Sequence, residues 1–268
     1  MTVHIEKQTS AYWKVILDNP PINLFDPEMS EEFQKLMAEL EADEEVKIVV
    51  FDSADPEYFM AHVDLVKTAD FDLTPRETGL AILPDFIRRL ELAPFLTVGV
   101  LRGRARGVGS EFLLGLDVRF ASLEKGIISQ IEVGCGVIPG EGGLERLCKQ
   151  VGRSKALEII LSADDFDAET AARYGWINRA VPDAELDRFI ERFVARISSF
   201  DRKVLALAKG LINDRCGLIP VEDLQETEKR FFETLTWTET EERIKTLFER
   251  GLQQRGEFEL NLGKSLGS

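Results

Sequence analysis

The stretch Phe95–Asp117 limits what this chain can fold into more than any other segment. Its apolar start, Phe95–Leu101, predicts a buried strand, and three glycines follow before a helix-like segment, Ser110–Leu116, that carries Glu111 in its first turn. Glycines permit tight turns, and the start of a helix presents unpaired N–H groups at a positive dipole end. The stretch therefore predicts a place for a negatively charged oxygen with a carboxylate beside it.

Short apolar strands and amphipathic helices alternate through the first two thirds of the chain. Alternating residues over 3–17 predict two adjacent strands, and KIVVF at 47–51 predicts another. Asp26-Pro27 predicts a helix start, because it combines a capping acid with proline at the first helical position. Repeated strand–helix–strand units predict parallel strands with right-handed crossovers.

The pattern changes after Glu185, where helical periodicity continues almost to the end and no strand is expected. This divides the chain into an α/β core over 1–195 and a helical C-terminal region over 196–268. Within the core, 126–133 predicts a strand that would leave Glu132 at its end. The tail, 263–268, is expected to fray.

Composition excludes several classes of function. The net charge of −15 argues against a general nucleic-acid binder, which needs clustered Lys and Arg. No apolar run approaches the roughly 20 residues of a membrane span, and the start MTVHIEKQTS lacks a signal-peptide pattern. Three scattered cysteines give no zinc-ligand spacing and fit a reducing compartment. We therefore expect a cytoplasmic protein with no metal, membrane or nucleic-acid partner.

Few common catalytic arrangements fit the sequence. A Ser-His-Asp or Cys-His site would depend on His62, because His4 lies in an alternating strand. Neither a G-x-S-x-G elbow nor a P-loop is present, and Phe112 occupies the third glycine position of a dinucleotide fingerprint. Glu111 and Glu132, each beside a glycine-rich turn, can serve as base and acid if the pKa of one is raised. The alternative is that both are exposed or capping carboxylates.

Five blocks of sequence, in order, resemble the crotonase superfamily, the enoyl-CoA hydratase/isomerase family. The resemblance covers about residues 10–260. The blocks are Asp18–Leu24, Tyr58–Leu65, Gly103–Asp117, Glu132–Leu147 and Ala168–Val181.

The resemblance implies a crotonase-like spiral of ββα units, with the helical C-terminal region assembling a homotrimer or a hexamer (a dimer of trimers). It implies an acyl-CoA thioester as substrate, with coenzyme A present only as part of that substrate and no permanently bound cofactor. The thioester oxygen would lie in an oxyanion hole made by the backbone N–H groups of Val63 and Val108. Glu111 would activate water and Glu132 would donate a proton, so hydration of a 2-enoyl-CoA is favoured.

The sequence also departs from the family pattern. Ala61-His62-Val63-Asp64 replaces the usual Ala-Gly-Ala-Asp, and Glu141 stands where a small residue is common. His62 would be an accessory acid or base, a CoA contact, or a bystander pointing away. The candidate contacts to the substrate or to CoA are Ala61, Asp64, Arg104 and Arg106. The two arginines would bind an acyl group with a distal carboxylate, or a CoA phosphate.

Other functions stay open at this point. Double-bond isomerisation and C–C bond hydrolysis of a β-dicarbonyl substrate are alternatives within the superfamily. A third alternative is a homologue that binds CoA but catalyses no reaction, and the altered loop at His62 favours it.

Overall fold

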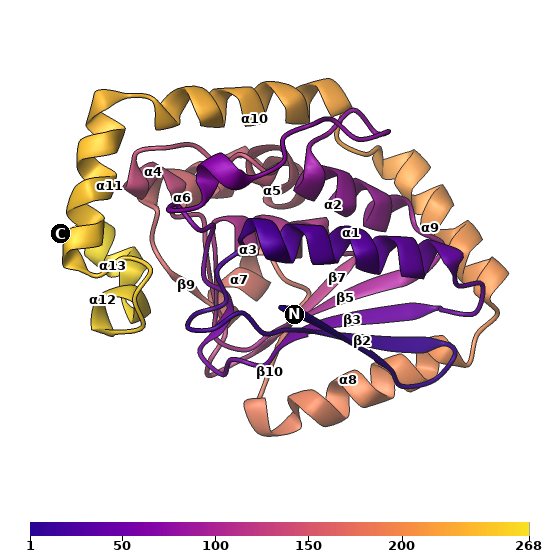
Figure 1. Ribbon diagram of the computed structural model, residues 1–268. Helices are drawn as coiled ribbons and strands as arrows, with labels where there is room; N and C mark the ends of the chain where they lie inside the picture. Colours follow the sequence, from indigo (N-terminus) through magenta and orange to yellow (C-terminus); the bar gives the residue numbers. More distant parts are fainter. Residues whose placement is uncertain (268) are drawn as a thin grey trace.

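The computed structural model describes residues 1–267, which form two sheets surrounded by helices (Figure 1). In the larger sheet, β1 and β2 are antiparallel, and β2, β3, β5, β7 and β10 run parallel. The expected parallel α/β body is thus confirmed. Along the sheet the strands are β1 (Val3–Lys7), β2 (Tyr12–Leu17), β3 (Ile48–Ser53), β5 (Leu96–Leu101), β7 (Val118–Ser122) and β10 (Arg179–Val181).

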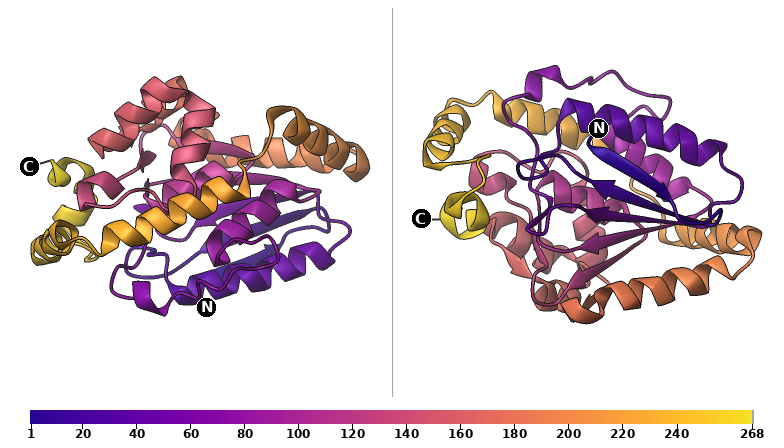
Figure 2. Two further views of the ribbon diagram at one scale, coloured as in Figure 1. Left: turned by 90° about the horizontal axis from the view of Figure 1, so that it is seen from above. Right: turned by 60° about the horizontal axis from the view of Figure 1, so that its bottom comes forward.

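Both faces of this sheet are covered. Phe51 of β3 lies in a core shared with α1 (Pro27–Ala42) and α2 (Ile82–Leu92), whereas its neighbour Val50 packs in a second core with α8 (Asp183–Ser198). Figures 1 and 2 show α1 and α2 on one side of the sheet and α8 on the other. A strand buried on both faces reads as a continuous apolar run, as β3 does.

Stacked phenyl rings join the first core to the helix of the opening stretch, α3 (Val108–Gly115). The ring centroid of Phe33 in α1 lies 4.7 Å from that of Phe86 in α2 and 5.3 Å from that of Phe112 in α3. Asp26 caps α1 as predicted, because its side chain accepts a hydrogen bond from a first-turn N–H. These contacts fix the start of α3 relative to the sheet.

The second sheet was not expected from the sequence. Its strands, in order, are β4 (Tyr58–Met60), β6 (Arg104–Arg106), β8 (Ile127–Ser129) and β9 (Phe166–Asp167). The expected strand at 126–133 is therefore too long, and Glu132 begins the short helix α4 (Glu132–Cys135) instead of ending a strand. The 3₁₀ turn η1 (Thr68–Asp70) lies in the loop between β4 and α2.

The region after β10 is helical throughout the described residues, as predicted. Its helices after α8 are α9 (Arg202–Cys216), α10 (Val221–Leu235), α11 (Thr238–Arg250), α12 (Glu257–Leu260) and α13 (Leu262–Leu266). Three further helices precede β10 in the chain: α5 (Gly143–Val151), α6 (Arg153–Ser162) and α7 (Ala168–Tyr174). The boundary at 195 falls inside α8, and the division into two domains stays a prediction. Among residues 1–267 no helix has the length and apolarity needed to cross a membrane.

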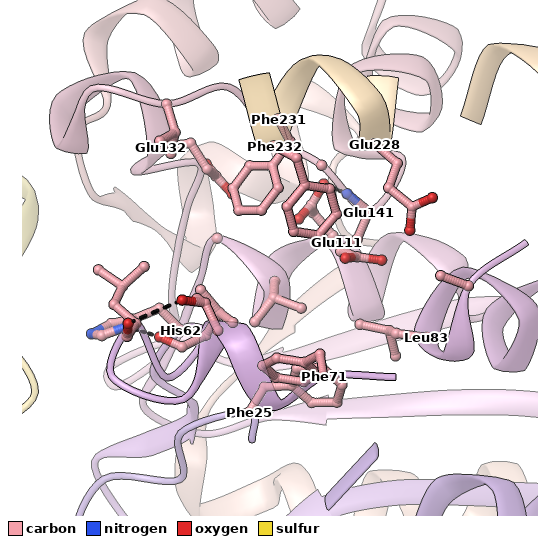
Figure 3. A pocket seen from close by; sticks show the side chains of 18 of the residues that line it. Phe25, His62, Phe71, Leu83, Glu111, Glu132, Glu141, Glu228, Phe231 and Phe232 are labelled. Carbon is pink, nitrogen blue, oxygen red and sulfur yellow. Dashed lines mark hydrogen bonds between the residues drawn. The ribbon is translucent and has the colours of Figure 1, made fainter. Parts of the chain in front are cut away.

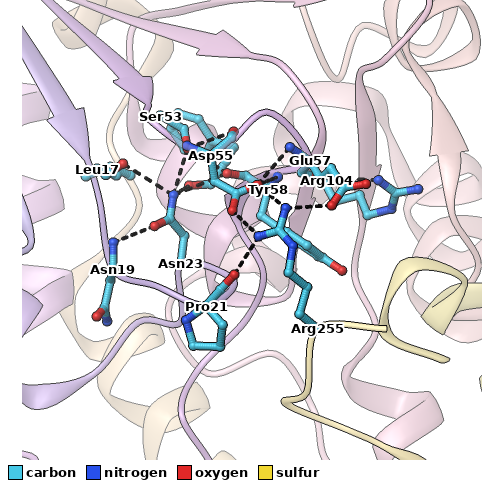
Figure 4. Close-up of polar contacts among 11 residues, drawn as sticks. Leu17, Asn19, Pro21, Asn23, Ser53, Asp55, Glu57, Tyr58, Arg104 and Arg255 are labelled. Carbon is cyan, nitrogen blue, oxygen red and sulfur yellow. Dashed lines mark hydrogen bonds and ion pairs between the residues drawn. The ribbon is translucent and has the colours of Figure 1, made fainter. Parts of the chain in front are cut away.

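The end of the chain packs back on the core. The expectation of a frayed tail is wrong for 263–267, because Leu262 and Leu266 of α13 are buried in a cluster with Ile131; Ser268 lies outside the described residues. Arg255 donates hydrogen bonds to the Pro21 carbonyl at 2.7 Å and to Glu57 Oε2 at 2.6 Å (Figure 4). The C-terminal segment is thus tied to loops near the N-terminus.

Candidate active site

The start of α3 lies directly against β4. Gly107 has φ +51° and precedes the first helical residue. A Cβ on Gly109 would lie 2.3 Å from the Met60 carbonyl oxygen, so only glycine fits there without displacing backbone. The two glycines that were the main sequence signal therefore bring the first turn of α3 against the loop after β4.

Glu111 is buried in this first turn and held in one orientation. Its Oε1 accepts hydrogen bonds of 2.8 Å from the N–H groups of both Glu141 and Gly143. A Cβ on Gly143 would lie 2.8 Å from the same oxygen, which explains the glycine at that position. Burial raises the pKa of Glu111 to about 7 despite these two bonds. The carboxyl group can thus gain or lose a proton near neutral pH.

Glu132 reaches the same pocket from α4. The side chain is buried, and Gly107 leaves space for it, since a Cβ there would lie 3.0 Å from Glu132 Oε1. Burial, followed by the charge of Glu111, raises the pKa of Glu132 well above its ordinary value. The two carboxyls interact and therefore titrate as a pair, with the pKa of each raised above the ordinary value of a glutamate.

The two backbone donors expected for an oxyanion hole also meet at this pocket. Val63 and Val108 both line it, and within residues 1–267 neither N–H has a hydrogen-bond acceptor. The carbonyl in the same peptide unit as each N–H accepts a hydrogen bond. The His62 carbonyl, which precedes Val63 N–H, accepts from Phe25 N at 2.9 Å, and the Gly107 carbonyl, which precedes Val108 N–H, accepts from Glu111 N at 3.0 Å. Such bonds polarise a peptide and strengthen its N–H as a donor.

The rest of the pocket is mostly apolar and is closed on one side by α10 (Figure 3). Four glutamates line it, and no lysine or arginine does so among the described residues. The contribution of α10 was not predicted from the sequence, although two adjacent phenylalanines, Phe231 and Phe232, stand in a mostly polar helix. The lining includes Phe71, Leu83, Glu111, Glu132, Glu141, Glu228, Phe231 and Phe232.

His62 is buried and has a partner on each ring nitrogen. Its Nδ1 lies 2.9 Å from the Val63 carbonyl, and its Nε2 lies 3.0 Å from Oε1 of Glu259, which is fully buried in α12. Burial lowers the pKa of His62, but the Glu259 carboxylate outweighs this effect and the net shift is upward. The imidazole therefore joins the loop of the first oxyanion donor to the C-terminal segment.

A second contact joins the same loop and segment. Gln253 donates from Nε2 to Asp64 Oδ1 at 2.7 Å and accepts from Leu65 N at 2.8 Å. Its own N–H donates to Glu259 Oε2 at 2.9 Å. The loop after β4 is thus fixed through both a histidine and a glutamine side chain.

The four candidate substrate contacts lie outside the pocket lining. Arg106 is fully buried, makes a bidentate ion pair with Asp165, and donates to the Glu259 carbonyl. Arg104 donates to the Leu260 carbonyl. The two arginines that suggested a site for an acyl carboxylate or a CoA phosphate thus anchor the C-terminal segment, because β6 directs their side chains toward it. For Ala61, in a small core cluster, and Asp64, bonded to Gln253, a substrate contact stays a prediction.

Comparisons with known proteins agree with this geometry. The family model for enoyl-CoA hydratase/isomerase matches residues 7–254. A short-chain-enoyl-CoA hydratase of Clostridium acetobutylicum is 31% identical over 79% of this chain and 80% of its own length. A probable enoyl-CoA hydratase of Mycobacterium leprae is 26% identical over 90% and 92%. The crystal structure of a putative enoyl-CoA hydratase from Streptomyces avermitilis superimposes with a TM-score of 0.93 at 40% identity, covering 99% of this chain and 96% of that one. This chain therefore belongs to the enoyl-CoA hydratase/isomerase family of the crotonase superfamily.

Proposed function

We propose that this enzyme hydrates a 2-enoyl-CoA to the 3-hydroxyacyl-CoA, with coenzyme A carried as part of the substrate. The observation that carries the proposal is the pair of buried, electrostatically coupled glutamates in one apolar pocket with two free backbone donors. Isomerisation moves a proton but adds no water, and one acid–base group is sufficient for it. Two neighbouring carboxyls with raised pKa values suit a reaction that both removes and delivers a proton.

The mechanism follows from what each group can hold. The thioester oxygen accepts hydrogen bonds from Val63 N–H and Val108 N–H, which stabilise its growing negative charge as the enolate forms. Ionised Glu111 takes a proton from water while the water oxygen bonds to Cβ. Protonated Glu132 then delivers its proton to Cα, and the carbonyl re-forms. The product has gained one water, and a proton returning from Glu111 to Glu132 restores the starting state.

Two variants test this assignment. Glu111→Gln and Glu132→Gln are each expected to lower kcat about 10²–10⁴-fold, the usual contribution of a positioned acid or base. Affinity for a saturated acyl-CoA should change little, because neither carboxyl is assigned to binding. Glu226→Gln, at an exposed position on α10, is the matched control. Wild-type rates in both pocket variants would exclude the glutamate mechanism.

Product analysis separates hydration from the alternatives. Loss of enoyl absorbance with a product heavier by one water supports hydration. A shifted double bond at constant mass would indicate isomerisation, and cleavage of a β-dicarbonyl compound would indicate hydrolysis. Titration calorimetry that detects no acyl-CoA binding would reject every assignment that has an acyl-CoA as substrate.

We also propose that the enzyme is a cytoplasmic homotrimer, with a dimer of trimers as its larger form. An apolar stripe on α9 supports assembly: Val204, Leu207 and Leu211 recur at helical spacing and are 64%, 63% and 42% exposed. Stripes of this kind mark protein interfaces. Sedimentation at micromolar concentration tests the assembly, and a monomer would contradict it. Cell fractionation tests the compartment.

A further inference from the structure

Two of the four carboxyl groups in the pocket have no task in the proposed reaction. Glu141 stands on the loop before α5, and Glu228 stands on α10. Figure 3 shows Glu228 and Leu83 at the end of the pocket away from His62, with Glu141 between Glu228 and the catalytic pair. Both groups therefore face the part of the pocket beyond the oxyanion loop.

One oxygen of the Glu141 carboxyl group is buried without a partner, and the residue as a whole is partly buried. Its Oε2 is inaccessible to solvent and makes no hydrogen bond within residues 1–267. Its backbone N–H bonds to Glu111 at 2.8 Å, so the side chain begins beside the catalytic carboxyl. Burial, followed by the charges of Glu111 and Glu228, raises the pKa of Glu141 well above its ordinary value. An unpaired buried carboxyl oxygen is costly, and a donor from a bound molecule removes that cost.

The surroundings of Glu141 select the kind of group that can pair with it. Burial also raises the pKa of the half-buried Glu228, and the rings of Phe231 and Phe232 stand next to it along α10. Arg146 is the cation that opposes the pKa rise at Glu141, but it donates to Glu91 and to the Glu141 carbonyl and does not line the pocket. A ligand carboxylate would therefore meet acidic and aromatic groups and no cation.

We propose that Glu141 and Glu228 form a subsite for an acyl group that carries a hydrogen-bond donor, a hydroxyl or an ammonium, beyond Cβ. The inference rests on the proposed function, since it takes the thioester to lie at the Val63 and Val108 N–H groups. It reverses the expectation that arginines hold an acyl group with a distal carboxylate. A hydroxyl would donate to Glu141 Oε2, and an ammonium would in addition gain from the aromatic rings and an ionised carboxylate.

Binding of saturated acyl-CoA compounds tests the subsite without requiring turnover. Titration calorimetry with 6-hydroxyhexanoyl-, 6-aminohexanoyl-, heptanoyl- and adipoyl-CoA compares a hydroxyl, an ammonium, a methyl and a carboxylate at one position. We expect at least one donor compound to bind about tenfold more tightly than heptanoyl-CoA, and adipoyl-CoA to bind most weakly. Tighter binding of the 6-hydroxyhexanoyl compound would identify a hydroxyl as the donor, and tighter binding of the 6-aminohexanoyl compound would identify an ammonium.

Variants assign the preference to the two residues. Glu141→Leu should abolish it and improve adipoyl-CoA binding, and Glu141→Gln should keep a hydroxyl preference but lose an ammonium one. Glu228→Gln, at a half-buried position, should weaken the preference several-fold, whereas Glu226→Gln, at an exposed position on the same helix, should leave it unchanged. If the wild type shows no donor preference, or if the preference survives both Glu141→Leu and Glu228→Gln, the subsite is rejected. Donor-selective binding with no hydration of any enoyl-CoA would instead reject the proposed function alone.

Discussion

Replacing Glu259 with alanine is expected to destabilise the protein by about 3–5 kcal/mol, the range for removing one partner of a buried ion pair. Glu259 Oε1 lies 3.0 Å from His62 Nε2, and its Oε2 accepts a 2.9 Å bond from Gln253 N. Losing a hydrogen bond to a charged group costs about 1.5–3 kcal/mol, and a buried N–H left unpaired costs about 1–3 kcal/mol. The two losses together overlap the range for the pair.

The sign of the pH dependence follows from the two shifts. The pKa of His62 is raised above its ordinary 6.5, so its contribution to stability is complete below that value and is lost as pH rises through the folded-state pKa. The pKa of Glu259 is lowered from 4.5, so its contribution is complete above that value and is lost as the solution becomes more acidic. The pair therefore stabilises the fold most between those two ordinary values, and the cost of Glu259→Ala should decrease in alkaline solution.

Urea denaturation at fixed protein concentration measures this cost, because assembly makes stability concentration-dependent. The free energy of unfolding is compared for wild type, Glu259→Ala and Glu259→Gln at mildly acidic and alkaline pH. Glu257→Ala, exposed on the same helix, is the control and should lie within about 0.5 kcal/mol of wild type. A cost for Glu259→Ala below about 1 kcal/mol, or one that does not change with pH, would refute the assignment of a buried ion pair.

Three other perturbations test separate parts of the molecule. Gly109→Ala should lower both the melting temperature and kcat, because its Cβ would lie 2.3 Å from the Met60 carbonyl oxygen. The control Gly210→Ala, with open space around it, should leave stability unchanged or increase it. Equal melting temperatures for the two variants would contradict the tight packing at Gly109. The kcat/KM for hydration should rise as pH increases through about 7, because the pKa of Glu111 is about 7 and the base acts ionised; a flat profile from pH 6 to 8 would exclude that role. Leu207→Glu should reduce the sedimenting mass while preserving the far-ultraviolet circular dichroism, since it charges the exposed stripe of α9; an unchanged mass would remove this stripe from the proposed interface.

The larger sheet could be predicted from the sequence because its central strands are continuous apolar runs and its helices have clear starts. The smaller sheet could not, because its strands are only two or three residues long and one of them is Arg-Ala-Arg. A strand of two or three residues is too short to show an alternating pattern, and two arginines are typical of a solvent-exposed segment rather than a buried strand. Arg106 is fully buried because an acid 59 positions later pairs with it.

The candidate site was predictable where the chain signals it locally. A glycine run before Glu111 and a glycine-rich turn after Glu132 marked both carboxyls, and their meeting in one pocket was expected from the family resemblance. The partner of His62 lies 197 positions away and has no local signal, since Glu259 sits in an ordinary acidic helical segment. The cover that α10 forms over the pocket likewise depends on how the C-terminal region folds back, which periodicity does not specify.

Because residues near the last helices anchor the loop after β4, this loop can reach its final conformation only after those residues have been synthesised. A chain still emerging from the ribosome contains Val63, Val108, Glu111 and Glu132 long before it contains Gln253 and Glu259. Until those late residues are made, His62 and Asp64 lack their C-terminal partners, and the loop keeps only contacts with earlier parts of the chain, such as the bridge between Phe25 and Val63. Products of premature termination would therefore carry the proposed catalytic carboxyls and donors but lack their support. A chain that stops before Gln253 therefore lacks the side chains that fix the loop after β4.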